Sequence, residues 1–529
     1  MGQKVNNEII IKARQEDFHS GRHFIEKYLR GKGISSVIVD ETVIVFESIF
    51  DSMMLSKKYQ DTDIHISGHT SLGDVRIKMA FAGESFSIDE DDGSDLSPEG
   101  RIIQAYEDKI ETSYHSGRNR IIISVRRSHT RTSLPSTAAM LLAIAVFLPL
   151  RQMLGEEQSL ALVLNYMLPL ERCFLNAVLM VGAPVTFLSL LKNLTDAFLR
   201  SENARETDKL LRTILYTSVV AIILAAGTIV GLSYCMGNSM AASGDGGLTL
   251  NMSAPEFIES VVPPSLFEAF VSISPFPLLV IAVLTAYACC SIGKYFDSVK
   301  KAVDACYALL SRMLSIVMFF LPLACFLAFG DALLDEGAFV LVEILAVVGV
   351  VAVGSVIMIL YYAARLRARG ISPLPFFRKM VPMLQENLKI STTIDSAPYN
   401  IRYCARVYGM NRRDLENVFP VLAQLNLNGN CSILMLISMA MIVMSGSQLQ
   451  LSETILIGII VLFLSLGAPN QQGSILIGLS IIINYMEVPE LICFCIYSEV
   501  LFGSLLNIQN VIGDTVDFAI LEKTKKASA

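Results

Sequence analysis

An acidic side chain stands near the end of a long apolar stretch of this chain. Asp514 follows Asn510 by four residues, a spacing that places both on one face of a helix. No Lys or Arg occurs between Arg413 and Lys523, so no basic side chain of that stretch can neutralise the carboxylate. An ionisable group in apolar sequence marks an ion or substrate pathway, and two oxygen-bearing side chains suit a hard cation such as sodium. The alternative is a carboxylate at the membrane interface that faces water.

A second polar group interrupts the apolar sequence upstream. Leu425–Asn430 contains three Asn and a Gly, which are poor helix formers and poor membrane residues. The pattern favours a local unwinding whose free carbonyl groups would bind a cation. The alternative is a polar contact between neighbouring helices.

Two more polar strips, Ile390–Pro398 and Gly467–Ser474, lie between apolar flanks. They predict the tips of two re-entrant helical hairpins, over about 375–403 and 453–486. Helix ends that meet at such tips offer unpaired N–H groups to an anionic ligand. Each hairpin precedes a polar span, which is typical of an inverted repeat with a binding site at the membrane midplane.

The composition divides the chain into a soluble quarter and a membrane body. Hydrophobic residues make up 53% of the chain, and 39 of its 91 charged residues precede residue 132. All six His lie at or before His129, which excludes a histidine proton relay in the body. The body shows neither a nucleophile constellation nor a phosphate loop, so we expect no enzyme, no cofactor and no nucleic-acid partner. Sodium is the expected coupling ion; proton coupling would instead need one of four acids, Asp395, Glu499, Asp514 or Asp517.

Apolar runs predict eight membrane-spanning helices near 136–154, 168–190, 213–235, 255–293, 305–329, 337–363, 411–446 and 490–521. With these spans, every cluster of basic residues falls on the side that holds the N-terminus. By the positive-inside rule that side is the cytoplasm. The expected fold is therefore an all-α polytopic protein of the plasma membrane (the cell inner membrane), with both termini cytoplasmic.

The soluble quarter, residues 1–130, has the pattern of an α+β sandwich. Strands are predicted at Ser36–Val39, Ile64–Ser67, Asp74–Phe81 and Arg120–Val125, and helices at about 15–31, 41–57 and 99–109.

The order of these motifs over about 134–529 resembles the dicarboxylate/amino acid:cation symporter family, which has the glutamate-transporter fold. Thr392–Pro398 resembles the family's serine-rich tip, and Asn426–Asn430 resembles its Asn-Met-Asp-Gly-Thr motif. Gly467–Asn470 is similar to its Gly-x-Pro-Gly tip, and Asn510–Asp514 matches its Asn-Val-x-Gly-Asp motif.

The resemblance implies a homotrimer in the lipid bilayer that carries a small organic solute, an amino acid or a carboxylate, together with sodium. The scaffold would comprise 134–330 without the third helix. The transport part, 211–235 and 337–529, would move across the membrane as an elevator.

The resemblance assigns cation coordination to Asp514, Asn510 and Asn426. Thr217 and Ser218 match a hydroxyl pair of another sodium site. The aspartate of that site is replaced here by Asn428, which removes the charge that offsets a dehydrated cation. We therefore expect the second site not to function as it does in the family.

Substrate recognition departs further from the family. Leu506 replaces the arginine that clamps a side-chain carboxylate, and Gly503 replaces the aspartate that binds the amino group. Aspartate and glutamate are thus poor candidate substrates. A different polar pocket would use Thr392, Thr393, Asp395, Asn430, Gln471, Gln472, Gly503, Leu506, Asn507 and Asn510, with Glu499 nearby. Alternatively, those of these residues that lie at the hairpin tips are exposed to water and bind no ligand.

Residues 1–128 weakly resemble the ATPase fold of histidine kinases and anti-sigma factors. Glu47–Asp51 falls at that family's magnesium-binding helix, and Phe81 replaces the aspartate that reads adenine. We expect nucleotide binding to be lost or much weakened, and the domain to regulate the body or to bind a cytoplasmic protein. The alternative overall function is a receptor or scaffold that kept a transporter fold and lost transport.

Overall fold

The computed structural model of the chain describes residues 8–528 except 15, 33, 35, 56–58, 60, 72–73, 85, 87–109, 116, 126–132, 200–203, 236–258, 260, 272, 389–391, 445–449, 470–472 and 487–491. Two compact units emerge. The first contains residues 1–131, 381–421 and 521–529, and the second contains 132–380 and 422–520. Sequence alone placed a boundary at 130–134; the first unit also takes in later segments of the chain.

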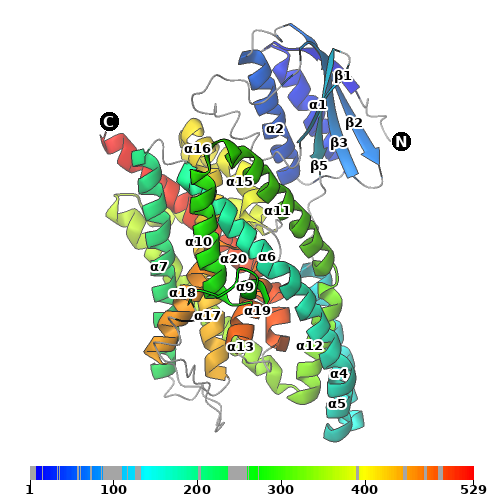
Figure 1. Cartoon of the computed structure of the whole chain (residues 1–529), viewed down its shortest axis with the longest axis vertical. Coiled ribbons are helices and arrows are strands. Elements are labelled where there is room, and N and C mark those ends of the chain that lie inside the picture. The colour runs from blue at the N-terminus through cyan, green and yellow to red at the C-terminus, as the bar shows by residue number, and fades with distance from the viewer. Residues whose placement is uncertain are drawn as a thin grey trace. The chain divides into compact units, whose positions relative to one another are not determined.

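The first unit contains a five-stranded antiparallel sheet in the order β1-β2-β3-β5-β4 (Figure 1). Its strands are β1 (Glu8–Lys12), β2 (Asp63–Ser71), β3 (Asp74–Ala82), β4 (Ile110–His115) and β5 (Arg118–Val125). Alternate residues of β5 are buried, so one face of the sheet is covered. The helices α1 (Phe18–Gly31) and α2 (Ser36–Leu55) share a core cluster with that face.

Three of the four predicted strands are confirmed, and the strand predicted at Ser36–Val39 is wrong. That segment begins α2. Its β-branched residues favoured a strand, but Val39, Val43 and Phe46 recur at helical spacing and are fully buried. Burial in the tertiary structure therefore makes this segment helical, although its local sequence favours a strand. Strands β1 and β4 were not predicted, and the helix expected at 99–109 lies outside the described residues.

The remaining part of the first unit carries α15 (Thr393–Tyr403), the π-helical turn Cys404–Tyr408 and the first turns of α16 (Arg412–Leu425). Gly409 ends the π turn with a φ of 67°, in the left-handed region that favours glycine. Helix α15 packs against α2.

The second unit is helical. In chain order, its first elements are α4 (Ser133–Leu154), α5 (Glu156–Leu162), the π turn Val163–Met167, α6 (Leu168–Leu199), α7 (Ala204–Cys235), α9 (Glu268–Val271), α10 (Pro275–Ser291) and the short turn Gly293–Tyr295. It continues with α11 (Phe296–Met318), α12 (Leu321–Asp335), α13 (Phe339–Ala368), α14 (Pro373–Asn387), α17 (Asn428–Met444), α18 (Leu451–Leu466), α19 (Ser474–Met486) and α20 (Ile492–Ser528). Helices α14, α16 and α20 run from one unit into the other.

Five helices of the described residues are long and apolar enough to cross a membrane, or six if the bent pair α11–α12 is one span. The predicted spans at 136–154, 168–190, 213–235, 337–363 and 411–446 correspond to the five, and 305–329 corresponds to the pair. Helix α10 is shorter than a span and α20 is not among the five, so the count of eight stays a prediction.

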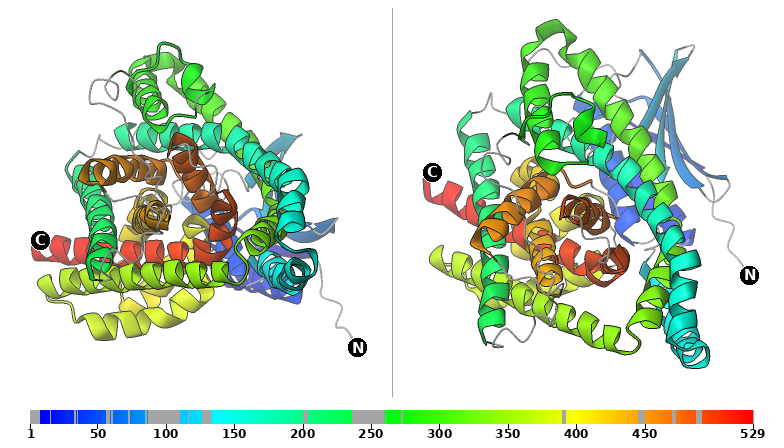
Figure 2. Two further views of the ribbon diagram at one scale, coloured as in Figure 1. Left: turned by 90° about the horizontal axis from the view of Figure 1, so that it is seen from below. Right: turned by 60° about the horizontal axis from the view of Figure 1, so that its bottom comes forward.

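Both predicted hairpins are helix–break–helix segments. The first consists of α14 and α15, whose break includes the undescribed residues 389–391. The second consists of α18 and α19 around Gly467–Gly473. Helix α17 contacts α7, α13, α18 and α19, which surround it when the second unit is viewed end-on (Figure 2). Polar residues at the start of α17 therefore lie inside the second unit.

Candidate functional site

The candidate cation site begins at a gap between two helices. Helix α16 ends at Leu425 and α17 begins at Asn428, so Asn426 and Leu427 interrupt one continuous 32-residue apolar segment. The predicted local unwinding is confirmed at these two residues. All three Asn of the motif, Asn426, Asn428 and Asn430, are buried.

Asn426 lies opposite two carboxylates of α20. Its side-chain amide donates to Asp514 Oδ1 over 3.0 Å and to Asp517 Oδ2 over 2.9 Å. Asp514 is fully buried, so it does not face water. Its second oxygen, Oδ2, is buried without a hydrogen-bond partner among the described residues. An orphaned carboxylate oxygen is costly in a dry interior, and a bound cation would satisfy it.

Asn510 joins α20 to the start of α17. Its Oδ1 accepts from the Gly429 amide over 2.7 Å, and its Nδ2 donates to Asn430 Oδ1 over 3.0 Å. A Cβ at Gly429 would lie 2.5 Å from the Leu506 carbonyl oxygen, so only glycine allows this approach. The Asn motif thus makes the polar helix–helix contact considered as an alternative, in addition to the break.

The two hydroxyl groups on α7 are hydrogen-bonded to side-chain amides. Thr217 donates to Asn426 Oδ1 over 3.2 Å, and Ser218 donates to Asn428 Oδ1 over 3.3 Å. Asn428 Nδ2 also donates to Asn426 Oδ1, over 3.0 Å. The side-chain oxygens of Asn426 and Asn428 therefore accept hydrogen bonds here, and the loss of this second cation site stays a prediction.

Arg365, on α13, is a residue of this centre that sequence reasoning missed. It forms a charge-assisted hydrogen bond with the buried carboxylate of Asp517. In sequence it belongs to a cluster of basic residues after an apolar run, a pattern that predicts a cytoplasmic loop and gives no sign of a buried partner. The available signal was Asp517 itself, because a buried acid needs a partner.

A carboxylate of α20 lies against the tip of the second hairpin. Glu499, on α20, accepts hydrogen bonds from the backbone amides of Gly473, Ile475 and Leu476, over 2.9, 3.1 and 3.2 Å. These amides start α19. The expectation that they are unpaired and open to an anionic ligand is wrong, because Glu499 already fills the positive end of this helix.

The predicted substrate residues fall in several places. Asn430 lies on α17, and Gly503, Leu506 and Asn507 lie on α20 of the second unit, where Leu506 and Asn507 are buried. A Cβ at Gly503 would lie 3.3 Å from Glu499 Oε1, so Glu499 is adjacent to the position where the family carries its aspartate.

Three predicted substrate residues belong to the first unit. Thr392 caps the start of α15 by accepting a hydrogen bond from the Asp395 amide over 3.1 Å, and Thr393 is buried beside it. Gln471 and Gln472 lie outside the described residues.

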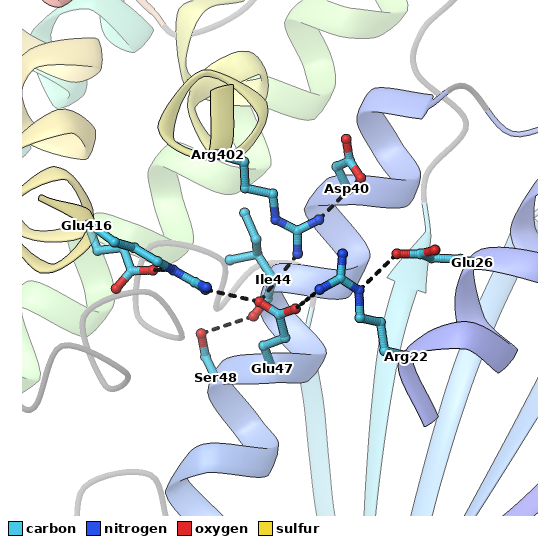
Figure 3. Close-up of polar contacts among 9 residues, drawn as sticks. Arg22, Glu26, Asp40, Ile44, Glu47, Ser48, Arg402 and Glu416 are labelled. Atoms are coloured by element: carbon cyan, nitrogen blue, oxygen red, sulfur yellow. Dashed lines mark hydrogen bonds and ion pairs between the residues drawn. The ribbon is translucent and has the colours of Figure 1, made fainter. Parts of the chain in front are cut away.

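A separate cluster of charges joins α2 to α15 and α16 within the first unit (Figure 3). Glu47 pairs with Arg22 over 3.3 Å, with Arg402 over 3.4 Å and with Arg412 over 3.0 Å. Arg402 also pairs with Asp40 over 3.1 Å. The side chain of Glu47 is only 7% exposed, so these pairs are partly shielded from water.

Two residues on which the ATPase resemblance depends, Glu47 and Phe81, make contacts within the first unit. Glu47 is paired with arginines, as described above. Phe81 is buried and meets Tyr59 and Phe86 edge to face, with ring centroids 5.6 and 5.8 Å apart. Phe81 is therefore part of a buried aromatic cluster.

Long apolar helices indicate a membrane protein, and broken hairpins with a buried Asn–Asp centre at a helix interruption are typical of secondary transporters. Residues 137–524 match the model of the sodium:dicarboxylate symporter family, and the chain belongs to that family.

Two curated relatives illustrate how distant its members are. The chain is 22% identical to a C4-dicarboxylate transport protein of Rhodopseudomonas palustris over 311 residues, which cover 57% of this chain and 69% of the relative. It is 24% identical to excitatory amino acid transporter 4 of Mus musculus over 237 residues, which cover 43% of this chain and 40% of the relative.

Proposed function

We propose that the protein is a secondary active transporter that couples the uptake of a small organic solute to sodium by an elevator motion. The observation that carries this proposal is Asp514, a fully buried carboxylate beside a helix break with one oxygen left without a partner in the described structure. Sodium is a hard cation, and carboxylate, amide and carbonyl oxygens would replace the water around it.

The solute we propose has no second carboxylate. Leu506 stands where a clamping arginine would be needed, and Glu499 occupies the helix end that could otherwise hold an anion. Glu499 also lies next to Gly503, where it would offer a counter-charge to an amino group. A neutral amino acid or a related amine fits these charges better than a dicarboxylate does.

We further propose that this protein couples to fewer sodium ions than a family member with an intact hydroxyl-pair site. The hydroxyls of Thr217 and Ser218 are used by amides, and Arg365 supplies a resident positive charge to Asp517. A fixed guanidinium stabilises the buried carboxylate as a bound ion would, so a further ion would add net charge to an apolar interior.

The setting proposed for this activity is a homotrimer in the plasma membrane with both termini in the cytoplasm. The scaffold comprises 134–330 without the third helix, and the transport part comprises 211–235 and 337–529. Residues 1–130 form a regulatory domain that acts on the first hairpin through the ion pairs of Glu47. Arg402, one of its partners, lies on α15, and Arg412, another partner, begins α16.

The test is uptake by purified protein in liposomes. Labelled neutral amino acids, succinate and aspartate are offered with an inward sodium gradient or with choline in its place. We expect at least one neutral amino acid to accumulate with sodium only, and Asp514→Ala to abolish it. Asp335→Asn, an exposed acid at the end of α12, is the matched control and should keep uptake. Equal uptake in choline would contradict sodium coupling.

A non-transporting receptor or scaffold is the second candidate. Glu499 favours it, because a hairpin end closed by the protein's own carboxylate resembles an occupied site. Solute binding measured as a rise in melting temperature, with no uptake of the same solute into liposomes, would favour this function over transport.

A further inference from the structure

Three side chains with metal-ligand atoms meet in the second unit, away from the candidate cation site at Asp514. Glu171 lies on α6, Asp331 on α12 and Cys493 in the first turn of α20. One ligand atom from each lies within 4.8 Å of the other two. The Cys493 sulfur is 3.1 Å from Glu171 Oε2 and 3.2 Å from Asp331 Oδ2.

No basic side chain of the described residues pairs with the two carboxylates of this cluster. Glu171 is 0% and Asp331 is 6% exposed, and within the described part of the chain no ion pair joins either carboxylate to a basic side chain. Glu171 Oε1 is buried and has no hydrogen-bond partner there. Two buried carboxylates in contact with one thiol require either shared protons or a cation.

We propose that Glu171, Asp331 and Cys493 form a binding site for a divalent cation of the zinc class. The thiolate sulfur favours zinc or cadmium over sodium, magnesium or calcium, which prefer oxygen ligands alone. The thiol gives its proton to solvent as the metal–sulfur bond forms, together with any proton held by the carboxylates. Water would complete the coordination.

The geometry needs only a small adjustment. Zinc–sulfur and zinc–oxygen bonds of about 2.3 and 2.1 Å in a tetrahedron separate sulfur from oxygen by about 3.6 Å. The present contacts of 3.1 and 3.2 Å would therefore open slightly when the ion replaces the thiol proton.

Such an ion would join α6 and α12 to α20. Resting on the proposed function, it would tie the scaffold to the moving part and slow the elevator motion. The binding site itself does not depend on that function, because it is defined by the three ligands alone.

The probe is Cd²⁺, whose bond to a thiolate gives an ultraviolet charge-transfer band. Purified full-length protein is titrated with Cd²⁺, alongside Cys493→Ser and Cys495→Ser. Cys495 is fully buried on the same helix and is the matched control. We expect a saturable band in the wild-type protein and in Cys495→Ser, and loss of that band in Cys493→Ser. Zn²⁺ should raise the melting temperature of the first two proteins and not of the third.

Amide exchange tests the link between helices. Zn²⁺ should slow exchange in the described first turns of α20, and Glu171→Gln should remove most of this effect. An equal cadmium band in the wild-type protein and Cys493→Ser would overturn the site. A band that depends on Cys493 but leaves exchange in α20 unchanged would overturn the bridge between helices, whether or not any solute is transported.

Discussion

Asn426 and Asp514 are joined by a hydrogen bond of 3.0 Å, which connects the break before α17 to the last long helix of the chain. The same amide of Asn426 also reaches Asp517, which is paired with Arg365. Asp514 has no basic partner of its own in the described structure, so the two acids of α20 are treated differently. Asp517 has a basic partner within the protein, and we propose that Asp514 binds an ion instead.

Asp514→Asn should remove the stabilisation of the protein by sodium. Sodium at a hundred times its dissociation constant would stabilise the folded wild-type protein by about 2.7 kcal/mol. The variant should show the same melting temperature in sodium and choline chloride. Asp335→Asn serves as the control and should respond as the wild type does; an equal sodium response in Asp514→Asn would place the ion elsewhere.

Arg365→Gln should destabilise the second unit strongly. It leaves the buried carboxylate of Asp517 without its counter-charge, a loss typically of about 3–5 kcal/mol. The double variant Arg365→Gln/Asp517→Asn should recover much of the melting temperature, because neither charge is then left alone. Arg367, exposed two residues later on α13, provides the control Arg367→Gln. A double variant no more stable than the single one would show that the pair does not act as a unit.

Glu499→Gln should loosen the start of α19. The variant keeps an acceptor but loses the negative charge at the helix N-terminus, at a cost of about 1–3 kcal/mol. Hydrogen exchange at Gly473, Ile475 and Leu476 should become faster, and more so in Glu499→Ala. If the helix end then accepts an external anion, succinate should raise the melting temperature of the variant and not of the wild type. Unchanged exchange would show that the carboxylate does not hold the tip.

The breaks in the helices could be predicted because they depend on local composition. Asn and Gly at 426–430 disfavour a helix whatever surrounds them, and the polar strips at the hairpin tips do the same. The partners of Asp517 and of the α19 amides could not be predicted. Arg365 and Glu499 are remote in sequence from the groups they bind, and their spacing in the chain carries no sign of the contact.

The soluble domain shows the same division. The segments β2, β3 and β5 alternate apolar and polar residues and were identified, whereas Ser36–Val39 was misassigned because its burial is set by the sheet it covers. Its link to α15 depends on charges at Asp40, Glu47 and Arg402, which look like ordinary surface residues in sequence.

Asp40 should make the stability of the first unit depend on pH. Burial raises the pKa of its carboxyl above the ordinary value, and this outweighs the opposite effect of Arg402. The folded state therefore binds a proton more tightly than the unfolded state. Stability falls as pH rises from about 3.9 through the raised pKa, and is level above it. Asp40→Asn should match the wild type in acid and exceed its melting temperature near neutral pH. A constant difference at all pH values would exclude this titration.

Glu47→Gln should loosen the contact between residues 1–130 and α15. The substitution keeps the size of the side chain but weakens its pairs with Arg22, Arg402 and Arg412. Hydrogen exchange should become faster both in α15 and on the facing turns of α2. Glu26→Gln is the matched control, because it breaks an ion pair of Arg22 that involves neither α15 nor α16. Equal exchange in α15 for the wild-type protein and Glu47→Gln would show that these charges do not hold the helices together. Faster exchange that is accompanied by a changed rate of uptake would identify residues 1–130 as a regulator of transport.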